Sequence, residues 1–149
     1  MDSFLSILQQ CGEELPLPMG NEKLTYAMQD LNQMLLTISD EEILKMGETN
    51  KKEVANLMRN YAEFVNLLIF IKPSLMGAVS LRMVELTLEW GLTAVCPCAF
   101  AFYGGILVSM GSQYVNEACR LGAWKNSLHL SHVHRKLTNL TSPLKQKLP

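Results

Sequence analysis

The sequence lacks any charged side chain between Glu89 and Glu117. Helices on the surface of a soluble protein carry charge on their outer face, so this stretch is not an ordinary solvated segment. It is also long enough to supply the roughly 20 apolar residues that cross a bilayer. Two interpretations follow: the most buried helix of an all-helical domain, or a membrane span near residues 92–110.

Glycine and proline within the uncharged stretch favour the buried helix. Gly91 is placed to close the preceding helix, Pro97 fits the first turn of the uncharged one, and Gly111 can end it. A lone membrane span has no need of these residues. We therefore predict a soluble core helix over about residues 94–110, and keep the membrane span, with membrane localisation, as the alternative.

The N-terminus lacks the basic flank and the long apolar core of a secretory signal. We therefore expect a cytoplasmic protein. In that compartment the cysteines predict reduced thiols rather than a disulfide framework. The four are Cys11, Cys96, Cys98 and Cys119.

A structural zinc site is not predicted. Cys96 and Cys98 are closer than the usual pair of zinc ligands, which stand two to four residues apart. The nearby histidines, His129, His132 and His134, have no paired cysteine beside them. We expect buried thiols and a solvated histidine turn, and no cofactor.

Acidic side chains are missing from the C-terminal end. Residues 120–149 hold six Lys/Arg and no Asp/Glu, whereas residues 1–119 hold seven Lys/Arg against 14 Asp/Glu. A basic tail can bind nucleic acid, but the aromatic residues that stack on bases are missing after Trp124. We therefore predict no nucleic-acid partner.

Apolar residues recur at steps of three and four, which predicts helices and no β-sheet. Asn21 and the capping-box pair Ser39 and Glu42 mark two helix starts. Asn50 and Ser74 are expected to begin the two helices that follow. On the second of these, Arg82, Glu85 and Glu89 are expected to occupy the outer face.

Three regions follow from these signals. Residues 1–20 form a leading helix and a proline-containing breaker, and residues 21–130 form the helical domain. Residues 131–149 form a basic C-terminal tail that is partly disordered. Short links between helices require antiparallel neighbours, so the predicted architecture is an all-α helix-turn-helix stack.

Three segments carry a resemblance to a known family. They are Leu81-Arg-Met-Val-Glu-Leu-Thr-Leu-Glu-Trp-Gly-Leu92, Ala99-Phe-Ala-Phe-Tyr-Gly104 and Glu117-Ala-Cys-Arg-Leu-Gly122. In spacing and in their Tyr-Gly and Arg-Leu-Gly pairs they resemble the helical-repeat region of signalling proteins that fuse an AAA-type ATPase to Ser/Thr or histidine kinase modules. Ser39-Asp-Glu-Glu-Ile-Leu44 also resembles a short segment that precedes this region, and the resemblance covers about residues 35–128.

The resemblance implies a tetratricopeptide-like α-solenoid, and the chain would be a fragment or a stand-alone relic of that region. Its implied role is protein interaction or coupling, with docking to ATPase or kinase modules. The phosphate loop, the His-Arg-Asp loop and the Asp-Phe-Gly motif are all missing, so no enzyme activity is expected. The candidate partner-binding residues are Tyr103, Tyr114, Arg120, Trp124 and Lys125.

Overall fold

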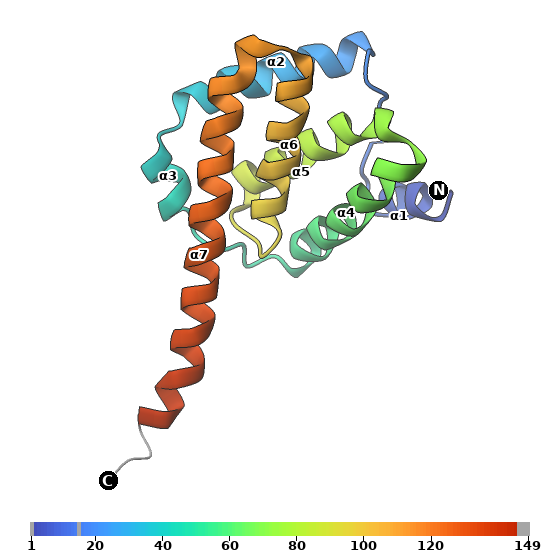
Figure 1. Cartoon of the computed structure of the whole chain (residues 1–149). Coiled ribbons are helices and arrows are strands. Elements are labelled where there is room, and N and C mark those ends of the chain that lie inside the picture. The colour runs from blue at the N-terminus through green and yellow to red at the C-terminus, as the bar shows by residue number, and fades with distance from the viewer. Residues whose placement is uncertain (1, 15, 146–149) are drawn as a thin grey trace.

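Seven α-helices make up the described part of the chain (Figure 1). The computed structural model describes residues 2–14 and 16–145, with side chains described from Ser3 to Val133. The α-helices are α1 (Asp2–Gln10), α2 (Glu22–Thr37), α3 (Asp40–Lys45), α4 (Lys52–Ile71), α5 (Met76–Trp90), α6 (Cys96–Met110) and α7 (Val115–Lys145). Two short 3-10 turns, η1 (Pro73–Leu75) and η2 (Ser112–Tyr114), precede α5 and α7. The all-α prediction is confirmed, since these residues contain no β-strand.

Consecutive helices pack against one another in the second half of the molecule. Helix α4 packs on α5, α5 on α6, and α6 on α7. Helices α2 and α3 pack instead on α5 and α7, which are distant in sequence (Figure 1). Neighbour packing therefore accounts for α4 to α7, and a tetratricopeptide-like order of the whole chain stays a prediction.

Local sequence signals define several helix ends. The Ser39 backbone N–H donates to Glu42 Oε2 at 2.7 Å, and the Glu42 N–H donates to Ser39 Oγ at 3.2 Å, which completes the predicted capping box. Gly91 ends α5 with φ 98°, a left-handed conformation that favours glycine. Pro97 lies in the first turn of α6, as predicted.

Two predicted helix caps are wrong, and one helix is longer than predicted. Lys51, not Asn50, is the residue that precedes α4. Thr49, the residue before Asn50, donates its backbone N–H to the Leu92 carbonyl, and this bridge delays the start of the helix. Ser74 lies within η1, so it does not cap α5. Helix α7 continues through residues 131–145, which were predicted as a tail, and residues 146–149 lie outside the described part.

The uncharged stretch forms α6, a core helix between α5 and α7, although α5 and not α6 is the more buried of the two. Phe100, Tyr103 and Leu107 are fully buried along its inner faces. Gly104 faces α7, and a Cβ at this position would lie 3.4 Å from the carbonyl oxygen of Ala118, which is an ordinary contact distance. Gly105 faces open space, so one narrow side of α6 is exposed.

The alternative prediction of a membrane span concerned residues 92–110. Leu92 lies before the helix, in a parallel bridge with Glu48, and α6 itself has 15 residues. Crossing a bilayer takes about 20 residues. In the part of the chain that the structure describes, no helix has both the length and the apolar character to span a membrane.

Gly91 and Gly105 form a matched pair of tests for the fold. A Cβ on residue 91 would meet the Gly47 carbonyl oxygen at 2.7 Å, and its φ of 98° strains any other residue. We expect Gly91→Ala to lower the free energy of unfolding by about 1–3 kcal/mol. Gly105→Ala should raise it by about 0.5–1 kcal/mol, because alanine favours the helix. Urea denaturation monitored by circular dichroism measures both, and equal stabilities would contradict the bridge geometry.

Candidate functional site

Arg120 on α7, a predicted partner-binding residue, contacts the turn between α2 and α3. Its Nε donates to Asp40 Oδ1 at 2.7 Å, and Nη1 donates to the Leu35 carbonyl at 3.0 Å. Nη2 donates to the Ile38 carbonyl, and Nη1 also pairs with Glu117 on its own helix. The Arg120 guanidinium therefore joins α7 to the end of α2 and the start of α3.

Trp124 and Tyr103 lie in the core. Trp124 Nε1 donates to Asp40 Oδ1 at 2.9 Å, and the Trp124 ring packs edge-on against Phe100. Tyr103 donates its hydroxyl to Asn32 Oδ1 on α2 at 3.0 Å. Both side chains are almost completely buried, so in this structure they contact the chain's own helices.

The other two predicted residues lie nearer the surface. Tyr114 is half-buried in η2, and Lys125 is exposed on α7. Trp124 stacks under the Arg120 guanidinium, 4.5 Å from the ring centre, but the five residues do not form one open surface. Among the side chains that the structure describes, no three His, Cys, Asp or Glu are grouped closely enough to hold a metal ion.

A second polar cluster centres on Glu13, in the connection between α1 and α2. Arg82 on α5 donates from Nε to Glu13 Oε2 at 2.7 Å and from Nη2 to Oε1 at 3.0 Å. Tyr61 on α4 donates its hydroxyl to Oε2 at 2.9 Å. The Glu13 side chain is only 10% exposed, so this paired contact fastens the N-terminal connection onto α4 and α5.

These contacts shift three pKa values. The hydrogen bonds from Arg82 hold the pKa of Glu13 below its ordinary value of 4.5, although burial partly opposes the shift. Conversely, the Glu13 carboxylate raises the pKa of Arg82. Burial, together with the negative charge of Glu13, raises the pKa of Tyr61. At neutral pH the cluster therefore holds one carboxylate, one guanidinium and one neutral phenol.

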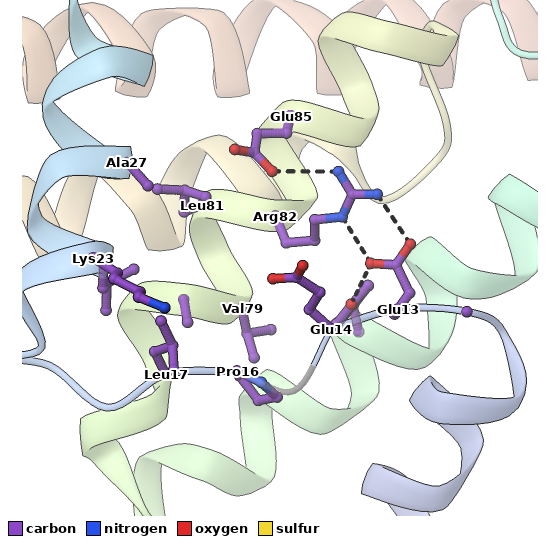
Figure 2. Close-up of a pocket in the computed structure, with 14 residues that line it drawn as sticks. Glu13, Glu14, Pro16, Leu17, Lys23, Ala27, Val79, Leu81, Arg82 and Glu85 are labelled. Carbon is purple, nitrogen blue, oxygen red and sulfur yellow. Dashed lines mark hydrogen bonds and ion pairs between the residues drawn. The ribbon is translucent and has the colours of Figure 1, made fainter.

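The Glu13 cluster forms one wall of a pocket of about 470 Å³, which we call the α2–α5 pocket (Figure 2). Its floor is aliphatic and includes Ala78, Val79 and Leu81 of α5. Its rim carries two further charged side chains, Lys23 from α2 and Glu14 from the α1–α2 connection. Neither side chain has a hydrogen bond or an ion pair with a described residue.

A patch of exposed apolar side chains lies at the C-terminal end of α4. Phe70 is 85% exposed, Ile71 62% and Leu67 54%. Positions three and four apart share one face of a helix, so these three residues form a continuous strip, here called the α4 strip. Phe64 lies one turn earlier on this face and is covered by Phe4 of α1. Polar Glu63, Asn66 and Lys72 lie beside the strip in sequence and are exposed.

Neither the α2–α5 pocket nor the α4 strip was predicted from the sequence. Arg82 was expected to face outward, and its partner Glu13 is too distant in sequence for any local pattern to pair them. A signal for the α4 strip did exist. Residues 67–71 are all apolar, which is more than one buried face of a helix can accommodate.

No protein-family model, no curated protein and no solved structure matches this chain. The resemblance to the repeat region of ATPase and kinase fusion proteins therefore depends on the quoted sequence segments alone. Function has to be inferred from the geometry of the surfaces described above.

Arg120 and Lys125 test whether the predicted partner residues have an internal role. Arg120→Gln removes donors from the Leu35 and Ile38 carbonyls, so the free energy of unfolding should fall by about 2 kcal/mol. Lys125→Gln alters an exposed residue on the same helix and should change it by less than about 0.5 kcal/mol. Chemical denaturation of both variants is the measurement, and an Arg120→Gln variant as stable as the wild type would contradict the described contacts.

Glu13 should make stability depend on acid pH. Because its pKa is lower in the folded chain than its ordinary 4.5, its contribution is present above about pH 4.5 and is lost as the pH falls through the folded value. The free energy of unfolding should therefore fall more steeply below pH 5 in the wild type than in Glu13→Gln. Glu14→Gln is the control, since Glu14 accepts no hydrogen bond from a described residue. Parallel curves for wild type and Glu13→Gln would contradict the assignment.

Proposed function

We propose that this chain is a non-catalytic helical interaction module that binds a protein partner through the α4 strip. The observation that carries the proposal is the exposure of Leu67, Phe70 and Ile71 side by side on one helix. Contiguous apolar surface bordered by polar residues is typical of protein-binding sites. The family resemblance in residues 35–128 supports the same class of function, with an ATPase or kinase module as the proposed partner.

The shape of the strip favours a helical segment as the bound element. The strip is a ridge along one helix, and such ridges pack into the grooves of a second helix. An amphipathic helix would present its own apolar residues at steps of three and four to match. The partner is therefore expected to offer an apolar helical face with polar groups at its borders, opposite Glu63 and Lys72.

The energy available from the strip sets a lower limit on the contact area. Complete burial of one large apolar side chain contributes about 1.5–3 kcal/mol, so three contribute about 5–9 kcal/mol at most. Association costs at least about 4 kcal/mol in lost freedom of motion. Micromolar binding requires about 8 kcal/mol net, so the partner must also contact residues around the strip.

Site-specific photocrosslinking in cells tests the proposal. A photoreactive residue at position 67, 70 or 71 should capture the same protein, because the three positions share one surface. The control is a photoreactive residue at Glu53, which is exposed at the start of the same helix and should capture that protein much less. The captured protein, once purified, should bind wild type at least tenfold more tightly than Phe70→Gln.

Two outcomes would overturn this function. The first is capture at the three strip positions that does not exceed capture at Glu53. The second is capture of another copy of the chain alone, which would make the α4 strip a self-association surface. Phe70→Gln changes a side chain that is 85% exposed, so a loss of binding would not be explained by unfolding.

A further inference from the structure

The α2–α5 pocket holds two ionic groups that the fold does not use. Its five charged side chains are Glu13, Glu14, Lys23, Arg82 and Glu85. Three of these are joined to one another, since Arg82 bonds Glu13 and also donates to Glu85 Oε2 at 3.3 Å. Lys23 and Glu14 remain without a described partner, and Figure 2 shows them pointing toward one another from opposite sides of the pocket.

The charges of the pocket argue against a simple anion or cation as its ligand. Three carboxylates face two cations, and the Arg82 guanidinium is already neutralised by Glu13. A phosphate would therefore meet Lys23 alone, together with the negative charge of Glu14. A lone cation would meet Glu14 and the surplus negative charge of the three carboxylates, but it would leave Lys23 unpaired. A ligand with one charge of each sign, held apart, can contact both exposed groups at once through charge-assisted hydrogen bonds.

The floor of the pocket indicates what should join those two charges. Leu24, Ala27, Ala78, Val79 and Leu81 line it, and all are aliphatic. The aromatic side chain of the lining belongs to Tyr61, whose hydroxyl is committed to Glu13, so the lining offers little for stacking a nucleobase. The ligand is therefore expected to carry an aliphatic body between its ammonium and its carboxylate.

We propose that the α2–α5 pocket binds a short peptide with free termini and aliphatic side chains. Its N-terminal ammonium contacts Glu14, its C-terminal carboxylate contacts Lys23, and its side chains lie on the α5 floor. A volume of about 470 Å³ is within the range of about 300–1,000 Å³ found for small-ligand sites. This site is separate from the α4 strip and does not depend on the interaction function proposed above.

Binding of trileucine and its blocked forms tests the proposal on the full chain. Isothermal titration calorimetry should show saturable binding of trileucine with free termini. N-acetylation removes the ammonium and C-terminal amidation removes the carboxylate, and each should weaken binding about five- to tenfold, as expected for a lost charge-assisted contact. No saturation by trileucine at millimolar concentration would overturn the proposal, and so would equal binding of the free and the blocked peptides.

Two variants assign each end of the peptide to its partner. Glu14→Gln should bind free and N-acetylated trileucine equally while still preferring a free carboxylate. Lys23→Gln should show the opposite pattern. Lys52→Gln, at an exposed position on α4, is the control and should keep both preferences. Both pocket side chains are exposed and have no described partner, so the variants should fold, which circular dichroism can verify. Wild-type preferences in Glu14→Gln and Lys23→Gln would overturn the assignment.

Discussion

The Arg120 guanidinium is the contact on which the arrangement of the N-terminal and C-terminal halves depends. The last turn of a helix leaves carbonyl groups without intrahelical donors, and at the end of α2 two carbonyls in this region receive hydrogen bonds from Arg120. The same side chain pairs with Asp40, the first residue of α3. Helix α2 ends at Thr37, where the Ile38 N–H donates to the Leu35 carbonyl, and Arg120 of α7 adds donors to the Leu35 and Ile38 carbonyls as the chain turns into α3.

The Asp40 carboxylate joins the N-terminal half of the chain to α7. A single oxygen, Oδ1, accepts from both Arg120 Nε and Trp124 Nε1, and these donors lower the pKa of the carboxyl, with Arg120 as the larger cause. The carboxylate itself lies near solvent, whereas the Trp124 ring is buried. The indole N–H thus reaches a polar partner at the surface while its ring fills the core.

Most of the helices could be predicted from the sequence because their signals are local. The capping box at Ser39 and Glu42 involves residues three apart, and periodic apolar positions need only the helix itself. The same logic failed at Asn50 and Ser74, where a bridge to Leu92 and the 3-10 turn at Pro73 decide the helix starts. Tertiary contacts prevail over local cap signals at both places.

The candidate sites were much harder to predict than the helices. Of the five residues chosen from the sequence, Arg120 and Trp124 lie together, but as part of an internal contact. The Glu13–Arg82 pair and the α2–α5 pocket join segments that lie far apart along the chain, so no local periodicity could reveal them. Exposure of the α4 strip was implied by its unbroken apolar run, yet only the packing shows which side of α4 is left open.

The short bridge between Gly47–Thr49 and Leu92 closes the base of the hairpin formed by α4 and α5. Thr49 donates to the Leu92 carbonyl and Leu92 donates to the Gly47 carbonyl, both at 2.9 Å. Backbone hydrogen bonds thereby close the segment from Thr49 to Leu92, which contains both helices. This closure lowers the conformational entropy of the α4–α5 hairpin in any state in which the neighbouring helices have detached. Helices α4 and α5 are thus tied together at both ends, by η1 at one end and by this backbone bridge at the other.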